Sequence, residues 1–241
     1  MAEFEDHVAG IGALADDTRR ALYLYVCAQP EAVGRDQAAA ALELPRHQAK
    51  FHLDRLEEAG LLDVEYARLT GRTGPGAGRP AKLYRRAAAR VAVSLPDRRY
   101  ELAAELMARA ISDSAATGTP VENALTSAAR EHGRRLAEAT TAAATATLSP
   151  KPADPDRALR LAADTLGRHG YEPRRHDHTV ELANCPFHPL AQTHTALICG
   201  MNHALLAALA EELAPGTLEA RLEPAAGRCC VLLTAGRRGP T

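Results

Sequence analysis

The pattern that begins at Pro45 restricts the fold more than any other part of the chain. Apolar residues recur at Ala49, Leu53 and Leu56, spaced by four and then three positions. This spacing predicts a helix with one buried side, with Pro45 in its first turn and Gly60 as its C-terminal cap. The residues that follow, LLDVEYARLT, are typical of a strand. The chain is thus expected to pass from a half-buried helix straight into a strand.

The segments around this pattern complete a first domain, residues 1–95. Two helical patches precede it in FEDHVAGIGALADDTRRALYLYVCAQ, and RDQAAAALEL predicts a further short helix. The first strand is followed by the glycine-rich turn GRTGPGAGRP and by a second strand, AKLYRRA. The expected order is therefore helix, helix, short helix, long helix and a two-stranded wing.

A second side of the long helix carries side chains that suit a DNA groove. Arg46, His47, Lys50 and Phe51 fall together away from the apolar repeat, and Gln48 could read adenine. A helix in a major groove needs an apolar back that anchors it and a front that reaches base edges and phosphates. We therefore predict that these five residues contact DNA.

Positive charge is concentrated in the wing. Between Tyr66 and Pro96 the chain has seven basic residues and no acidic one: Arg68, Arg72, Arg79, Lys82, Arg85, Arg86 and Arg90. The whole chain has a net charge of −1, so any site for a polyanion must be local. We predict that Arg68, Arg72, Arg79 and Lys82 contact DNA. A solvated surface would explain each basic feature alone, but their combination with this helix order indicates DNA binding.

The remaining chain divides into a helical region and a C-terminal domain. Residues 97–115 and 120–145 predict two helices, which we assign to a dimerisation and coupling region over 96–146. A segment rich in Pro, Ala and Thr is the expected linker, 147–155. Residues 156–241 then give the order helix, strand, strand, helix, strand, strand, which predicts a compact α+β domain.

The last domain contains most of the cysteines. Candidate metal ligands there are Cys185, Cys199, Cys229, Cys230, His188 and His194. Prolines beside Cys185 and a glycine after Cys199 predict a short helix, a break, and a second helix that starts at Gly200. The break would let the chain fold back and bring these two thiols together. It would also place Cys199 at a helix N-terminus, which favours the thiolate form.

The cysteine doublet falls in an expected final strand, GRCCVLLTA. Adjacent strand residues point to opposite faces, so we expect only one of Cys229 and Cys230 to be a ligand. His188 and His194 compete for the fourth position. Thiolates suit both zinc and iron–sulfur clusters, while a thiol redox switch and simple packing of buried cysteines are the alternatives. Cys27 stands alone and is expected to be a small buried apolar residue.

The termini and the motif content exclude several classes of protein. The N-terminal sequence MAEFEDHVAG is acidic and lacks the apolar core of a signal peptide. No segment approaches the roughly 18 apolar residues of a membrane span. We therefore expect a cytoplasmic protein without a membrane partner, in which cysteines serve metal or redox chemistry rather than disulfides. The chain shows no phosphate loop, no GxSxG and no carboxylate motif that would orient a catalytic base, so we expect it not to be an enzyme.

The stretch PRHQAKFHLDRLEEAGLLDVEYARLTGRTGPGAGRPAKLYRR resembles the winged helix-turn-helix of bacterial ArsR-like regulators. Its FHLDRLEEAGLL matches their passage from helix to wing. The resemblance implies a transcription regulator that binds a double-stranded DNA operator. Members are usually homodimers, which implies a palindromic operator with half-sites about one helical turn apart. The metal-binding cysteines of the arsenic-sensing members have no counterpart here.

The segment NCPFHPLAQTHTALIC resembles the C-terminal domain of the iron–sulfur-sensing repressors of the Suf cluster-assembly operon. In those proteins a similar Cys-Pro-Phe context opens a series of spaced cysteines. The resemblance implies an iron–sulfur cluster held by Cys185, Cys199 and the later cysteines. The spacing of the first pair and the doublet depart from the family pattern, which keeps zinc as the alternative.

The expected protein is mainly α with α+β. It has an N-terminal winged helix-turn-helix, central dimerisation helices and a C-terminal cysteine-rich α+β domain. We expect a homodimeric DNA-binding regulator controlled by an iron–sulfur cluster. The alternatives for the effector are a zinc site, a thiol switch or an organic ligand in the C-terminal domain.

Overall fold

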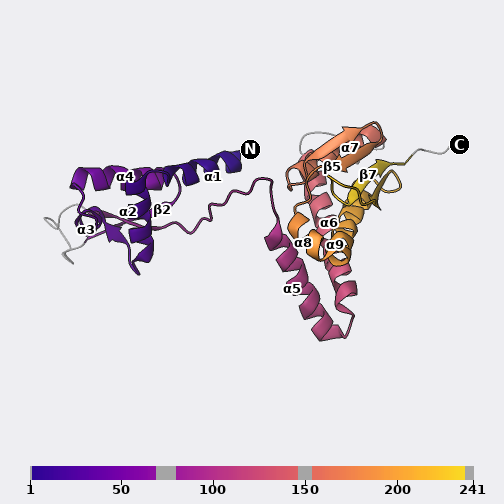
Figure 1. Cartoon of the computed structure of the whole chain (residues 1–241), viewed down its shortest axis with the longest axis horizontal. Helices are drawn as coiled ribbons and strands as arrows, with labels where there is room; N and C mark the ends of the chain where they lie inside the picture. Colours follow the sequence, from indigo (N-terminus) through magenta and orange to yellow (C-terminus); the bar gives the residue numbers. More distant parts are fainter. Residues whose placement is uncertain (1, 69–79, 146–153, 237–241) are drawn as a thin grey trace. The chain divides into compact units, whose positions relative to one another are not determined.

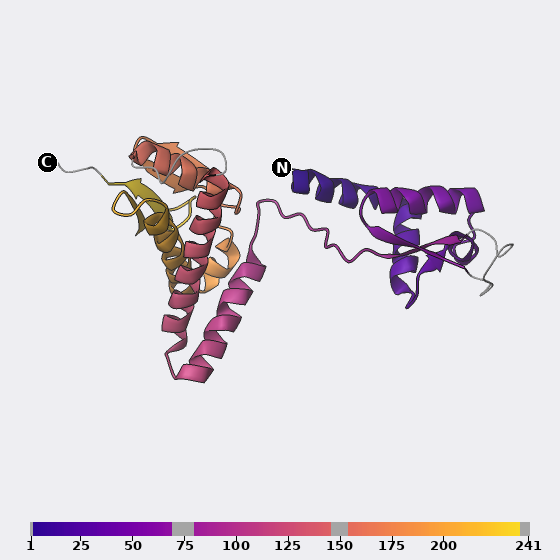
Figure 2. The same ribbon diagram turned by 180° about the vertical axis from the view of Figure 1, so that it is seen from behind.

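The computed structural model describes residues 2–68, 80–145 and 154–236. The chain divides into two compact units, Met1–Val93 and Ser94–Thr241 (Figures 1 and 2). Most of the described residues are helical, and each unit contains one small antiparallel sheet. The part of the fold class that predicts a mostly helical chain with some sheet is therefore confirmed.

The N-terminal unit has the expected helices and wing. Its described elements, in chain order, are α1 (Ala2–Ala13), α2 (Asp17–Ala28), β1 (Val33–Gly34), α3 (Arg35–Ala41), α4 (Arg46–Glu58), β2 (Leu62–Ala67) and β3 (Ala81–Arg86). The strands pair antiparallel in the order β1-β3-β2. The short strand β1 was not predicted, because two residues are too few to show an alternating pattern.

The predicted buried side of α4 forms the centre of this unit. Ala49, Leu53 and Leu56 are fully buried and pack with Leu22 and Val26 of α2. The N-cap of α2 is Asp16, whose side chain accepts a hydrogen bond from the backbone N–H of Arg19 at 2.8 Å. This packing fixes α4 so that its opposite side is presented to solvent.

The C-terminal unit combines a helical hairpin with an α+β layer. Its described elements are α5 (Tyr100–Thr117), α6 (Val121–Thr145), α7 (Pro155–Gly167), β4 (Pro173–His176), β5 (Thr179–Leu182), α8 (His188–Thr193), α9 (Thr195–Leu213), β6 (Leu218–Leu222) and β7 (Val231–Ala235). The sheet order is β4-β5-β7-β6, with every neighbouring pair antiparallel. Helices α7 and α9 pack against the sheet and against each other.

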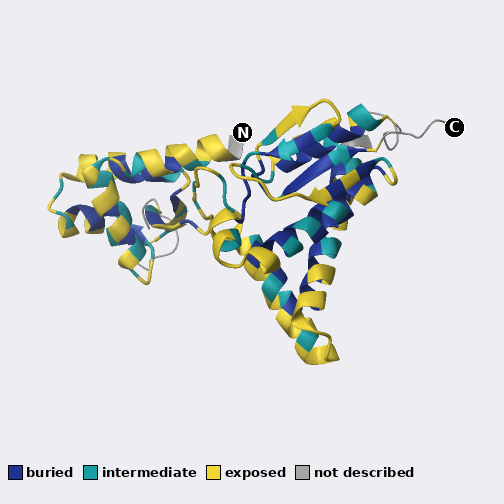
Figure 3. Ribbon diagram, turned by 45° about the vertical axis from the view of Figure 1, so that its right-hand side comes forward, coloured by how far each residue is buried: buried dark blue, intermediate teal, exposed yellow. Residues whose placement is uncertain are grey.

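Helix α9 is the central element of this unit. It lies beside α6, and Gly133 of α6 allows the two helices to approach closely at Leu205 and Ala208 (Figure 1). The far end of the α5–α6 hairpin is exposed, whereas α9 is largely buried (Figure 3). The expectation that no segment approaches a membrane span was wrong, because α9 is long and apolar enough to cross one. However, 61% of its apolar window is buried within the unit, as in a core helix.

The division into units differs from the expected domain layout. Helices α5 and α6 share one hydrophobic core with α7, α9 and the sheet, so residues 96–146 do not form a region of their own. The apolar side of α6 needs α9 as its partner, which sequence periodicity alone could not identify. Most of the expected linker, residues 147–155, lies outside the described residues.

Two local expectations around the cysteines were wrong. The helix break lies at His194, so Cys199 is the fifth residue of α9 and not at a helix N-terminus. The doublet does not lie in a strand, because β7 begins only at Val231. The alternation of strand side chains therefore does not apply to Cys229 and Cys230.

Candidate functional site

Helix α4 presents a polar surface to solvent. Arg46, His47, Gln48, Lys50 and Phe51 are all exposed, on the side away from the apolar residues that anchor the helix. The Phe51 side chain is 53% exposed on this side of the helix. The exposure agrees with the predicted DNA-contacting side of the helix, although the contacts themselves stay a prediction.

Two of these basic residues already have acidic partners. Arg46 forms a two-pronged ion pair with Asp36 of α3, in which Nε lies 2.6 Å from Oδ1. The Arg46 guanidinium lowers the pKa of Asp36 through these hydrogen bonds. Lys50 lies 3.0 Å from Asp54 one turn along α4. The Arg46–Asp36 pair ties the two helices of the helix-turn-helix to one another.

Lys82 on β3 is held by acidic side chains of α4 and is not a free cation. Its ammonium lies 2.7 Å from Oδ1 of Asp54 and also contacts Glu57. The Tyr84 hydroxyl donates to the same Asp54 oxygen at 2.7 Å. Burial lowers the pKa of Lys82, but its hydrogen bonds to the two carboxylates outweigh burial and raise that pKa. We therefore assign Lys82 to fixing the wing against α4, in place of the predicted DNA contact.

Asp54 is the shared acceptor of this network. Burial would raise the pKa of Asp54, yet hydrogen bonds from Lys82, Tyr84 and Lys50 lower it to about 2. The residue was missed in the sequence because an acidic side chain on a DNA-facing helix counts against binding. The signal that could have found it is its position four residues after Lys50, which pairs the two charges on one side of a helix.

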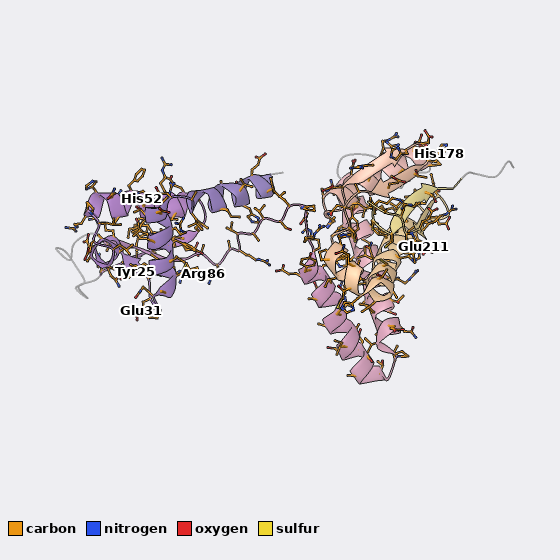
Figure 4. All side chains as sticks on the ribbon, in the orientation of Figure 1. Tyr25, Glu31, His52, Arg86, His178 and Glu211 are labelled. Atoms are coloured by element: carbon orange, nitrogen blue, oxygen red, sulfur yellow. The ribbon has the colours of Figure 1, made fainter. Side chains whose placement is uncertain are left out.

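Two further residues of α4 complete the description of its surface. Arg55 was not predicted, but its guanidinium lies 5.6 Å from the centre of the Phe51 ring, as in a cation–π contact. His52 is buried on the anchored side, 3.9 Å from the Asp16 carboxylate that caps α2 (Figure 4). Arg68 is exposed at the end of β2, whereas the predicted contacts Arg72 and Arg79 lie outside the described residues.

The C-terminal unit brings four thiols together from three segments. Cys185 lies in the loop between β5 and α8, Cys199 lies in α9, and Cys229 and Cys230 lie in the loop before β7. Electrostatic interactions link Cys185 with Cys229, Cys229 with Cys230, and Cys230 with Cys199, so the four thiols are neighbours. We call this group the thiol cluster. Both members of the doublet belong to it, contrary to the expectation that only one would.

Three members of the thiol cluster are buried and Cys230 is half-buried, and the cluster is electrostatically uneven. Hydrogen bonds from the Cys185 and Cys230 thiols, helped by the Val231 backbone N–H, lower the pKa of Cys229 well below that of an ordinary thiol. The pKa of Cys185 and that of Cys230 are raised, because each thiol is hydrogen-bonded to Cys229 and is removed from water. Cys229 is therefore the member most suited to being a thiolate.

A buried amide supports the Cys229 sulfur. Nδ2 of Asn202, on α9, donates to Sγ of Cys229 at 3.3 Å. The Tyr171 hydroxyl donates to Oδ1 of Asn202 at 2.6 Å, and both polar side chains are buried. Because the tyrosine occupies the amide oxygen, the amide N–H groups face the sulfur, which then acts as an acceptor. Neither residue was singled out in the sequence.

The predicted histidine ligands do not lie in the thiol cluster. His188 and His194 are exposed at the two ends of α8, whereas Cys185, Cys199 and Cys229 are buried. All five cysteines, including half-buried Cys27, are free thiols. Within the described ranges, no group of three or more His, Cys, Asp or Glu side chains is already arranged to hold a metal ion.

Comparison with known families agrees with the geometry of the N-terminal unit. Residues 14–65 match a family described as a helix-turn-helix domain, which covers α2, α3, α4 and most of β2. No curated protein and no solved structure matches the chain significantly. The N-terminal unit thus contains a helix-turn-helix domain, and this supports a DNA-binding regulator.

Proposed function

We propose that the chain is an ArsR-like, homodimeric transcription regulator whose thiol cluster binds an iron–sulfur cluster that controls DNA binding. The observation that carries this proposal is the convergence of the buried Cys185, Cys199 and Cys229 with the half-buried Cys230. Buried cysteines that serve only as packing residues have no reason to meet as a group of four. A helix-turn-helix in the same chain gives such a site something to regulate.

The residues present fit an iron–sulfur group by their chemistry. Such clusters are held by thiolates, and the described thiol cluster offers four sulfurs with one of them predisposed to lose its proton. Burial excludes solvent, and the Asn202 amide supplies a hydrogen bond to sulfur, both of which tune such groups. When bound, the group would supply a redox- and oxygen-sensitive change of state at these four residues.

The N-terminal unit would read the operator through α4. Gln48 and His47 are exposed on the helix and have polar groups that can address base edges, while Arg46 is held in place by Asp36. Arg68 extends the basic surface onto the wing. A homodimer would carry two such helices and therefore favour a palindromic operator. We place the protein in the cytoplasm, where thiols stay reduced.

The α5–α6 hairpin is our candidate for the dimer interface. Ile111 of α5 is 60% exposed and Val121 of α6 is 46% exposed, both near the far end of the hairpin. Large apolar side chains in such positions favour a protein partner. Size-exclusion chromatography with light scattering tests this assignment: Ile111→Glu together with Val121→Glu should give a monomer where the wild type is a dimer.

The experiment that tests the effector is purification without oxygen, followed by visible spectroscopy and analysis of iron, sulfide and zinc. We expect a coloured protein with stoichiometric iron and sulfide, and loss of both in Cys229→Ser and in Cys230→Ser. Cys27→Ser is the matched control, because Cys27 lies in the other unit and should leave the metal content unchanged. Retention of iron and sulfide in a variant that lacks all four clustered thiols would contradict the proposal.

A zinc site is the second candidate, favoured by the same observation, since four thiolates are a common ligand set for structural zinc. A colourless protein with one zinc per chain, lost in the same serine variants, would select it. A metal-free protein that still changes its DNA affinity on oxidation would select a thiol switch.

A further inference from the structure

The first residues of the C-terminal unit are hydrogen-bonded to the loop that carries Cys185. The backbone N–H of Arg99 donates to the Pro186 carbonyl at 3.1 Å. The Arg98 side chain donates through Nη1 to the Cys185 carbonyl at 3.0 Å and to Oδ1 of Asn184. Arg98 thus binds the loop that carries Cys185 through its side chain, and Arg99 binds it through its backbone. Both residues directly precede α5.

Asn184 closes this network from inside the unit. Its amide Nδ2 donates to the Gly170 carbonyl at 2.6 Å and to the Asp97 carbonyl at 3.0 Å. The Asn184 side chain is only 6% exposed, so these two bonds take the place of the hydrogen bonds that the amide would make to water. Gly170 has a φ of +85°, and a Cβ there would lie 3.0 to 3.2 Å from atoms of the Asp97 side chain. The contact of residue 97 with this turn is thus a close one.

This network lies next to the segment that joins the two units. The N-terminal unit ends at Val93, so only residues 94–96 separate it from Asp97. The same short segment that enters the C-terminal unit is the one fastened to the backbone of Cys185. Any displacement of the Cys185 loop acts directly on the segment through which the chain continues to the DNA-binding unit.

We propose that Arg98 and Asn184 are positioning residues that couple the state of the thiol cluster to the segment joining the two units. This inference rests on the function proposed above. In the described structure the Cys185 thiol contacts Cys229. Ligation would replace that contact with a bond to the ligand, and the sulfur would then need a new position. Because Arg98 holds the adjacent carbonyl, the loop and residues 97–99 must either move together or lose their hydrogen bonds.

Such a linkage would couple the two units, because the free energy of the joining segment would depend on whether the thiol cluster holds a ligand. A side chain that only stabilised the fold would weaken both states equally. Coupling by Arg98 instead predicts that its removal leaves each binding event intact and removes the influence of one on the other.

The test compares DNA affinities of the full chain in two states, as purified without metal and after anaerobic reconstitution with ferrous iron and sulfide. The DNA is a duplex selected from a random-sequence library with the wild-type protein. We expect the two dissociation constants of the wild type to differ by roughly 5- to 150-fold, the usual range of allosteric coupling. In Arg98→Met the ratio should fall towards one, with iron and sulfide content unchanged.

Two variants show that the loss is specific. Arg98→Lys keeps a cation that can reach the Cys185 carbonyl and should restore part of the ratio. Arg221→Met removes an arginine side chain of the same unit that pairs with Glu219, outside this network, and it should leave the ratio as in the wild type. Asn184→Leu removes the side-chain hydrogen bonds to Arg98, Asp97 and Gly170, and it should lower the ratio of dissociation constants as Arg98→Met does.

The outcomes separate this inference from the proposed function. A wild-type protein that binds iron and sulfide and responds to them, together with a full response in both Arg98→Met and Asn184→Leu, overturns the coupling role alone. A wild-type protein that takes up no iron and sulfide, or whose DNA affinity ignores them, overturns the proposed function and this inference with it. If Arg98→Met does not fold, the graded response of Arg98→Lys and Asn184→Leu decides.

Discussion

The ammonium of Lys82 on β3 lies 2.7 Å from Oδ1 of Asp54 on α4. Tyr84, two residues further along the same strand, donates to the same oxygen. These contacts fasten the wing to α4, the helix that we predict to face DNA. The basic residue that the sequence marked as a DNA contact is therefore engaged within the protein, and its removal should affect DNA binding through geometry.

We predict that Lys82→Met weakens DNA binding without changing its dependence on salt. A lysine that neutralises a phosphate contributes about 0.9 to the logarithmic salt slope, whereas a lysine that holds the wing in place contributes nothing. Measuring the dissociation constant at several salt concentrations separates the two roles. Tyr84→Phe removes the neighbouring hydrogen bond without a change of charge and should also weaken binding at constant slope.

Arg68→Met is the contrasting variant, because Arg68 is exposed at the end of β2 and belongs to the predicted DNA contacts. Its slope should fall by about 0.9. If Lys82→Met shows the same fall, Lys82 leaves its carboxylates on binding and contacts DNA as the sequence first suggested.

The Asp54 network should also make the N-terminal unit sensitive to acid. The pKa of Asp54 is lowered from 3.8 to about 2, so its stabilising effect is complete above pH 3.8 and is lost as the pH falls through 2. Asp54→Asn has no such titration. The difference in stability between wild type and Asp54→Asn should therefore shrink between pH 3.8 and 2. Hydrogen exchange of the β2 and β3 amides measures this in the intact chain; a constant difference would contradict it.

Gly133 should tolerate no side chain. A Cβ at this position of α6 would overlap the Leu205 carbonyl oxygen and lie 3.1 Å from the Cβ of Ala208 on α9. We expect Gly133→Ala to destabilise the C-terminal unit by about 1–3 kcal/mol, as overpacking does. Gly200→Ala is the control, since its Cβ meets nothing within 4 Å; it should stabilise α9 by up to about 1 kcal/mol. Urea unfolding followed by circular dichroism compares the two, and equal effects would refute the argument.

Removal of the amide behind Cys229 should weaken metal binding. Asn202→Leu leaves the sulfur without its side-chain donor, and outer hydrogen bonds of this kind typically contribute 10- to 100-fold in metal affinity. Competition with a chelator, with cobalt(II) as a spectroscopic probe, measures the change. Tyr171→Phe frees the amide to turn and should show a smaller loss.

The control for this pair is Thr165→Val. Thr165 is equally buried, but its hydroxyl bonds Thr140 and the Leu161 carbonyl. It should alter stability and leave the cobalt spectrum and affinity unchanged. A comparable loss of affinity in Thr165→Val would mean that metal binding reports core stability in general.

The sequence predicted what depends on local periodicity. The buried side of α4 at Ala49, Leu53 and Leu56, the order of helices, and the two strands of the wing all follow from spacing within a short window. The match to a helix-turn-helix family over residues 14–65 confirms that part. The pairing of Asp54 with Lys82 was not predicted, because the two residues lie far apart in sequence and meet only where β3 packs against α4.

The C-terminal unit shows the same limit. The sequence indicated that cysteines far apart could meet, but it placed the helix break too late and put Cys229 and Cys230 in a strand. Loop geometry decides which way both thiols point, and no residue pattern encodes it. The roles of Asn202 and Tyr171 depend on a tertiary contact between two buried polar groups, which single-sequence reasoning treats as ordinary core residues.

Along the chain, α8 lies between Cys185 and Cys199, and the rest of α9 and the strand β6 lie between Cys199 and the cysteine doublet. The four sulfurs can meet only after α9 has packed and the last strand has joined the sheet. A ligand bound to all four sulfurs would stabilise the folded unit, so the affinity for the ligand and the free energy of unfolding would be coupled. Loosening of the core would separate the three segments, so a destabilised chain would lose the site even where ligand is present.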